Sequence, residues 1–150
     1  MGQLPDSNLI ARRVGLVASH LFAAPSYVAQ FGEPQTPEQL SSHQCLHFQA
    51  GFAEQWRLRC GKQETVVQIK GDILTNSLGM NLALAKAGLG ITLLPRQTGL
   101  AQGNQLQQIL PKWQSVPVPI YMVTTTRLLP AKTQCFINFL TEKMQDWLDS

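Results

Sequence analysis

The stretch TNSLGMNLALAKAGLGITLLP (residues 75–95) predicts a turn, a helix and a strand that follow one another directly. Asn76 and Ser77 carry short polar side chains that accept hydrogen bonds from the free N–H groups at the start of a helix. Good helix formers follow up to Gly88, which ends the helix because glycine adopts the left-handed conformation without steric cost. The apolar run ITLL then predicts a buried parallel strand, so the stretch is a unit of an α/β fold.

The start of this helix is a candidate ligand site. In open α/β sheets, ligands bind at the carboxyl ends of strands, and the N-terminus of a helix offers free N–H groups and a positive dipole end to an anion. Asn76 and Ser77 are therefore candidates for direct ligand contact. The alternative is that both residues only cap the helix, since every helix start has N–H groups to satisfy.

Length and composition indicate one folded domain. The chain has 150 residues, of which 44% are apolar and 14% are charged, which is enough apolar content for a core. Its net charge of +3 comes from 12 Lys and Arg against 9 Asp and Glu, too scattered for a nucleic-acid-binding stripe. No apolar run approaches the roughly 18 residues of a membrane span, and no signal pattern opens the chain. We therefore expect a cytoplasmic protein without membrane contact.

The cysteines and histidines do not predict a metal centre. Cys45, Cys60 and Cys135 are odd in number and form no CxxC pair, which is typical of reduced thiols. In a strand, His43, Cys45 and His47 point to one side, but no fourth ligand lies nearby and the residues between them are partly apolar. A GxxxxGK phosphate loop is absent, and the GLG of the opening stretch lacks the third glycine of a dinucleotide fingerprint. We expect neither a metal nor a cofactor.

The first part of the chain predicts two strands and a short helix. Residues 9–14 and 16–24 are rich in β-forming side chains and are broken at Gly15, so we expect them to be adjacent strands. Residues 26–31 predict a short helix that ends at Gly32.

Two local signatures follow. Thr36, Pro37 and Gln39 are typical of a helix start, with a threonine cap, a proline at the first helical position and a glutamine that completes a capping box. Residues 56–60 and 65–69 alternate apolar and polar side chains on either side of a Gly-Lys pair, which predicts a β-hairpin.

The last part of the chain predicts a strand and a long helix. Residues 111–119 contain three prolines and predict a surface crossing, whereas residues 118–126 are dense in β-branched side chains. Pro130 begins the last helix, whose apolar residues recur every three or four positions and predict one stripe that covers a sheet. These residues are Cys135, Phe136, Phe139, Leu140, Met144, Trp147 and Leu148.

Five segments together resemble the effector-binding domain of LysR-type transcriptional regulators, in the same order and spacing. They are DSNLIARR, AAPSYVAQFGEPQTPEQLSSHQCL, WRL, AKAGLGITLLP and LLPAKTQCFINFL. The similarity covers residues 5–140, and the set is far more specific than any one segment.

The resemblance implies an α/β fold of the periplasmic-binding-protein-like type II, in which two Rossmann-like subdomains enclose a small molecule. Residues 26–117 would form the second subdomain, and residues 1–25 with 118–150 the remnant of the first. The resemblance therefore implies that this chain, residues 1–150, is a partial effector-binding domain without the family's winged helix-turn-helix. DNA would be bound only through that missing domain, and the parent protein would be a homo-oligomer.

The resemblance also implies effector-binding residues. Asn76 and Ser77, with Leu78 beside them, occupy the turn that faces the cleft from the second subdomain. The other candidates are the residues expected at the two chain crossings, which are Ala24, Pro25, Thr124 and Thr125. The effector is expected to be a small anionic or polar metabolite that is held and not transformed. The alternative for the crossing residues is ordinary packing at strand ends.

Two other classes of function remain open from the sequence. The segment TNSLG differs by one residue from the GxSxG nucleophile elbow of serine hydrolases, but every histidine precedes Ser77, whereas those enzymes place the histidine after the serine. We therefore expect no enzyme. The remaining alternative is a truncated fragment that only dimerises or has no function, because a sheet without its first strands leaves an apolar face uncovered.

Overall fold

The computed structural model describes residues 9–48 and 54–149. Within them the chain divides into two compact units. The described residues of Met1–Val17 and Pro117–Ser150 form the smaller unit, and those of Ala18–Val116 form the larger unit. The larger unit thus begins before residue 26, because the strand that follows residue 18 pairs inside it.

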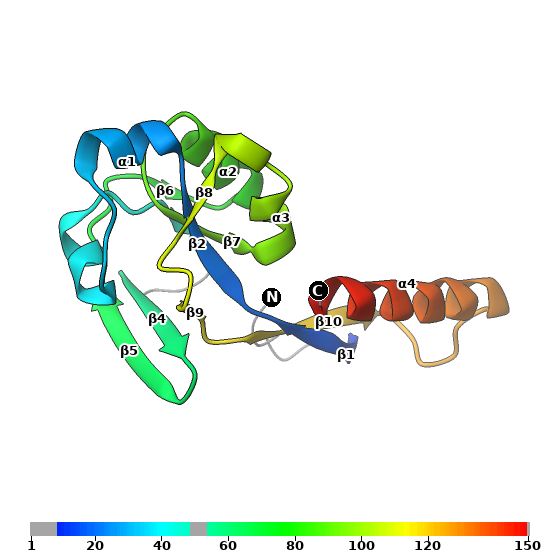
Figure 1. Cartoon of the computed structure of the whole chain (residues 1–150). Coiled ribbons are helices and arrows are strands. Elements are labelled where there is room, and N and C mark those ends of the chain that lie inside the picture. The colour runs from blue at the N-terminus through cyan, green and yellow to red at the C-terminus, as the bar shows by residue number, and fades with distance from the viewer. Residues whose placement is uncertain (1–8, 49–53, 150) are drawn as a thin grey trace. The chain divides into compact units, whose positions relative to one another are not determined.

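The larger unit combines strands and helices, as expected for an α/β fold (Figure 1). Its strands are β2 (Ser19–Ala23), β3 (His47–Phe48), β4 (Gln55–Cys60), β5 (Gln63–Gln68), β6 (Leu74–Thr75), β7 (Thr92–Pro95), β8 (Gln107–Ile109) and β9 (Gln114–Ser115). Its helices are α1 (Pro25–Phe31), α2 (Leu78–Lys86) and α3 (Arg96–Leu100), with the 3-10 turns η1 (Pro37–Ser42) and η2 (Gly103–Gln105).

The main sheet of the larger unit has the strand order β7-β2-β8, with β2 antiparallel to both neighbours. The expectation that β7 is a parallel strand is wrong for its pairing with β2, which is antiparallel. A short buried apolar run is compatible with a parallel or an antiparallel neighbour, so the sequence pattern did not determine the strand direction. On its other side β7 is parallel to the chain before β3, through an isolated bridge between Ile91 and Cys45, and β3 is parallel to β6.

The hairpin of β4 and β5 is confirmed. Cys60 pairs with Gln63 across the turn, and Gly61 has a φ of 61°, a left-handed conformation that suits glycine. Trp56 and Leu58 are buried on one face. The expected surface crossing at residues 111–119 is wrong in part, because β9 forms there and pairs with β4.

Glycines end the helices where the sequence predicts. Gly32 follows α1 with a φ of 83° and donates its N–H to the Val28 carbonyl at 2.8 Å. Gly88 follows α2 with a φ of 82°. The capping box at η1 is wrong in detail: the Thr36 side chain makes no cap hydrogen bond, and Gln39 Oε1 accepts from the Gln35 N–H at 2.8 Å. The short 3-10 turn places the side chains differently from an α-helix.

Apolar packing in the larger unit is extensive. Two clusters of buried side chains lie within residues 21–110. One is built around Leu21, Tyr27, Leu40, Trp56, Leu58 and Ile91, and the other around Phe22, Ala24, Leu46, Ala85, Leu94 and Leu106. Because β2 contributes to both clusters, it is the central strand of this unit.

The smaller unit consists of β1 (Ile10–Val17), β10 (Val118–Thr124) and α4 (Ala131–Asp149). β1 pairs antiparallel with β10, so the expectation that residues 9–14 and 16–24 are adjacent strands is wrong. Gly15 does not break the strand, because the register shift between Arg13 and Gly15 is absorbed within β1.

The apolar stripe expected on α4 is wrong for its largest members. Phe136 and Phe139 are 59% and 56% exposed, whereas Ile137 is only 6% exposed. The face that includes Ile137 packs on β1, where Gln145 Nε2 also donates to the Val14 carbonyl at 2.8 Å. A two-stranded sheet covers only part of the apolar surface of the helix.

Candidate functional site

The turn that starts α2 has the geometry of a helix cap. Ser77 is extended, with φ −134° and ψ 120°, and its Oγ accepts from the Met80 N–H at 3.2 Å. The predicted cap is therefore confirmed for Ser77. Asn76 and Ser77 are both exposed and Leu78 is half-buried, so the turn is open to a ligand. Direct effector contact by these three residues stays a prediction.

Two residues that the sequence did not single out hold this turn in place. The Thr75 hydroxyl donates to Asn81 Oδ1 at 2.6 Å, and the Ser77 N–H points to the same hydroxyl at 3.4 Å. Asn81 is only 1% exposed. A polar residue directly before the apolar run LALA (residues 82–85) was the available signal, since buried polar groups are normally hydrogen-bonded. The last residue of β6 is thus tied to the first turn of α2.

The turn lies at the carboxyl edge of the parallel strands in the larger unit. β6 ends at Thr75, and β7 runs in the same direction and ends at Pro95. Ser19, at the start of β2, pairs with Pro95 because β2 is antiparallel to β7. The start of α2, the start of α3 and the start of β2 therefore share this edge.

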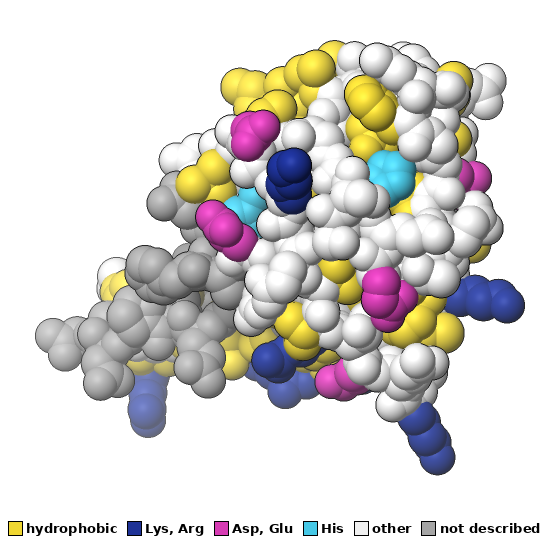
Figure 2. Space-filling model, turned by 90° about the vertical axis from the view of Figure 1, so that its left-hand side faces the viewer, with side chains coloured by type: hydrophobic (Ala, Val, Ile, Leu, Met, Phe, Trp, Pro, Cys, Tyr) yellow, Lys and Arg dark blue, Asp and Glu magenta, His cyan; other side chains and the backbone are white. Residues whose placement is uncertain are grey.

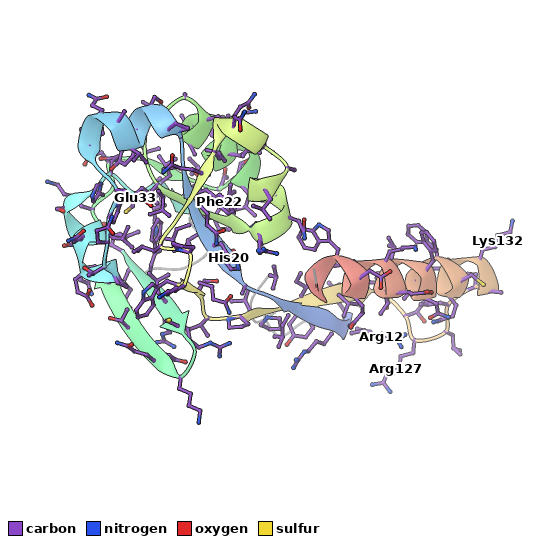
Figure 3. All side chains as sticks on the ribbon, in the orientation of Figure 1. Arg12, His20, Phe22, Glu33, Arg127 and Lys132 are labelled. Carbon is purple, nitrogen blue, oxygen red and sulfur yellow. The ribbon has the colours of Figure 1, made fainter. Side chains whose placement is uncertain are left out.

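His20 and Arg96 add polar and cationic chemistry to the same edge. His20 lies on β2, two residues before Phe22 (Figure 3), and its Nδ1 lies 3.1 Å from Gln108 Nε2. Burial lowers the pKa of His20, and the nearby Arg96 guanidinium lowers this pKa further. The imidazole is therefore neutral at pH 7, and Arg96 supplies the positive charge there. The sequence analysis missed both residues.

Ala24 and Pro25 lie at the other edge of the sheet. Phe22, near the end of β2, pairs with Thr92 at the start of β7, so the chain that leaves β2 emerges opposite the Ser77 turn. Ala24 is 2% exposed and packs in the cluster that contains Ala85. The structure does not bring these two residues together with Asn76 and Ser77, and their contact with an effector stays a prediction.

Thr124 and Thr125 belong to the smaller unit. Thr124 ends β10, and its hydroxyl donates to the Thr126 carbonyl at 3.1 Å, while Thr125 is exposed. Thr124 lines a hollow of about 340 Å³ whose wall also includes Arg12 and Arg127 (Figure 3). The two arginines make this hollow cationic.

His43 and Cys45 of the conceivable metal site have hydrogen-bond partners, whereas His47 Nδ1 is buried without a partner among the described residues. His43 Nδ1 lies 2.8 Å from the Tyr27 hydroxyl, and Cys45 Sγ lies 3.6 Å from the Leu40 carbonyl. Burial raises the pKa of the Cys45 thiol to about 12, so the thiol is protonated. In the described part of the chain no group of three His, Cys, Asp or Glu side chains is arranged to hold a metal ion. The Ser77 hydroxyl has the Met80 N–H as its hydrogen-bond partner.

Comparison with known proteins gives one consistent family. The family model "LysR substrate binding domain" matches residues 1–145. The HTH-type transcriptional activator AaeR of Escherichia coli is 34% identical over 146 residues, which are 95% of this chain and 47% of AaeR. An HTH-type transcriptional regulator of Haemophilus influenzae is 33% identical over 93% of this chain and 50% of its own length. The chain thus spans about half the length of these curated relatives.

Solved structures of regulatory domains have a fold similar to that of this chain. The regulatory domain of AphB from Vibrio vulnificus is 33% identical, with a TM-score of 0.69 over 93% of this chain and 71% of that domain. The regulatory domain of CrgA from Neisseria meningitidis is 27% identical, with a TM-score of 0.77 over 95% of this chain and 72% of that domain.

Proposed function

Because the chain belongs to the LysR substrate-binding domain family, we propose that it is the effector-sensing part of a bacterial transcriptional regulator. A small metabolite binds it and thereby changes how the longer regulator acts on DNA. DNA contact is made by a helix-turn-helix region of that regulator, which works in the cytoplasm as a homo-oligomer. The two compact units correspond to parts of the two subdomains of an effector-binding domain. The chain holds its ligand and does not transform it.

The observation that carries this proposal is the exposed Ser77 turn at the carboxyl edge of β6 and β7. It combines the free N–H groups at the start of α2 with the positive charge of Arg96 at the same edge. Both features favour an anion. The effector is therefore a small anionic metabolite, and Asn76, Ser77 and Leu78 contact it.

Sensing requires different affinities for two arrangements of the protein. A ligand shifts a conformational equilibrium only by the difference between its binding free energies to the two states. The Thr75–Asn81 hydrogen bond holds the Ser77 turn in one shape, so ligand contacts are made to a preformed surface. Effector contact by Ala24, Pro25, Thr124 and Thr125 is a separate part of the proposal, because Ala24 and Pro25 lie at the edge of the sheet opposite the Ser77 turn.

Substitutions of Ser77 test the proposal in the longer regulator. A panel of small carboxylates and phosphates is screened by thermal shift, and the hit is titrated against Ser77→Asp and Ser77→Asn. Both substitutions keep an oxygen acceptor for the cap, but only Ser77→Asp adds a negative charge. We expect Ser77→Asp to weaken the response about tenfold or more, because a like charge a few ångström from a bound anion repels it. An equal response in both variants would show that the effector binds elsewhere.

A further inference from the structure

The edge of the larger unit opposite the Ser77 turn contains a separate hollow of about 540 Å³. It is lined by Tyr27, Gln30 and Phe31 of α1, by Ser42, His43 and Gln44, by Lys70, and by Gly88 and Leu89 after α2. This volume is in the range of small-molecule sites. On the side of the molecule shown in Figure 2, histidine, cationic and acidic side chains all reach the surface, with uncharged atoms between them.

The floor of this hollow is a fixed hydrogen-bond network. The Tyr27 hydroxyl accepts from the Gln44 N–H at 3.1 Å and lies 2.8 Å from His43 Nδ1. His43 Nδ1 is the acceptor available to the Tyr27 hydroxyl proton among the described residues, so we assign that proton to the Tyr27–His43 hydrogen bond. Tyr27 is 1% exposed, and the centre of its ring lies 4.9 Å from that of the Phe31 ring at a tilt of 36°, so packing holds the network in place.

This network fixes the tautomer of His43. Burial lowers the pKa of His43, so the imidazole is neutral at pH 7. A neutral imidazole whose Nδ1 accepts a hydrogen bond carries its proton on Nε2. His43 therefore offers Nε2–H as a donor, and no described residue accepts from that nitrogen in the structure.

Charge and shape select the ligand. Lys70 is exposed and forms no ion pair with any described residue, and none of the lining residues is acidic. The ring of Phe31 and the side chain of Leu89, both exposed, supply apolar walls. The hollow thus combines a cation and a fixed N–H donor with an apolar surface, which matches a carboxylate carried on a small apolar body.

We infer that this hollow is a second ligand site of the larger unit, which takes a small monocarboxylate with an apolar body. The carboxylate accepts hydrogen bonds from Lys70 Nζ and His43 Nε2, and the apolar body lies against Phe31 and Leu89. The inference does not depend on the proposed function, since the Ser77 turn lies at the opposite edge of the sheet.

Titration of the full ¹⁵N-labelled chain tests this inference by amide chemical shifts. The probe is cyclohexanecarboxylate, and the uncharged probe of the same shape is cyclohexanecarboxamide. We expect saturable shifts at the amides of Gln44 and Leu89 with the carboxylate and much weaker binding of the carboxamide. Lys70→Gln should raise the Kd about threefold to fivefold, as expected for one exposed charge pair.

Further variants separate the contribution of the His43 donor to ligand affinity from that of the Lys70 charge. His43→Asn keeps an acceptor for the Tyr27 hydroxyl but lacks the Nε2–H donor, so it should also raise the Kd, by about twofold to tenfold. Lys62→Gln, in the turn between β4 and β5, removes a distant charge and should leave the Kd unchanged. Ser77→Asp should also leave it unchanged, which separates this site from the proposed effector site. Amide spectra of each variant verify its fold.

Four outcomes would overturn the inference. They are equal affinity of Lys70→Gln and the unaltered chain, equal affinity for the two probes, shifts centred on Asn76 and Ser77, and no saturable shift up to the solubility limit of the carboxylate.

Discussion

The ring of Phe22 packs directly against Gly99, where there is no room for a side chain. It points from β2 toward α3 (Figure 3), and it is 1% exposed. A Cβ placed on Gly99 would meet three carbon atoms of this ring at distances that real Cβ atoms essentially never show. Glycine at position 99 is therefore required by close approach of the ring, and a buried ring at the centre of the sheet has little room to move.

We expect Gly99→Ala to destabilise the larger unit by about 1 to 3 kcal/mol, the usual cost of overpacking a core. Urea unfolding followed by circular dichroism measures it. Gly79→Ala is the control, because its Cβ would meet only Ser77 Oγ at 3.6 Å, an ordinary contact. In a helix this change should be neutral or stabilise by up to about 1 kcal/mol. Equal effects of the two substitutions would contradict the assigned role of Gly99.

At the scale of elements, α4 shows how a helix can bury a narrower face than its sequence predicts. Three- and four-residue spacing placed Phe136 and Phe139 in the buried stripe, but β1 contacts the neighbouring face that includes Ile137. The Lys143 ammonium lies 6.0 Å from the centre of the Phe139 ring, so this exposed ring has a cationic neighbour.

Substitutions on α4 distinguish the two faces. Ile137→Ala should cost about 2 to 5 kcal/mol of unfolding free energy, because it removes buried methyl groups and leaves a cavity. Phe136→Ala should stay within about 0.5 kcal/mol of the unaltered chain, as exposed substitutions usually do. Helix loss on thermal melting measures both. A larger loss of unfolding free energy for Phe136→Ala than for Ile137→Ala would show that the face predicted from the sequence is the buried one.

At the scale of the whole molecule, burial is distributed unequally between the two units. Both apolar clusters lie in the larger unit. The buried side chains described in the smaller unit are Val14, Val17 and Ile137. Because apolar burial dominates folding stability, the two units should differ in their opening free energies.

Native-state hydrogen exchange of the full chain tests this difference. We expect amides in β2 and β7 to be protected by a larger free energy than amides in β1 and β10, since the latter pair opens without breaking either cluster. The Gly99→Ala variant serves as the reference, because it should lower protection in β2 more than in β1. Equal protection of all four strands would mean that the chain unfolds as one cooperative unit.

Local features of the chain were predictable from the sequence. Ser77 as a cap, Gly32 and Gly88 as helix ends and the Gly61 turn of the hairpin all depend on the conformational preferences of a few neighbouring residues. These preferences act within one turn of the chain, so their signals survive in the amino-acid order. The fold class came from a different source, the family resemblance carried by five segments in fixed order.

Long-range features were decided only in three dimensions. The antiparallel pairing of β7 with β2, the face of α4 that packs on β1, and the position of Ala24 opposite the Ser77 turn depend on contacts between residues far apart in the chain. The hollow around Tyr27 and His43 is likewise assembled from separate segments. An apolar run or a polar side chain has the same local pattern whichever partner it meets, and packing alone selects that partner.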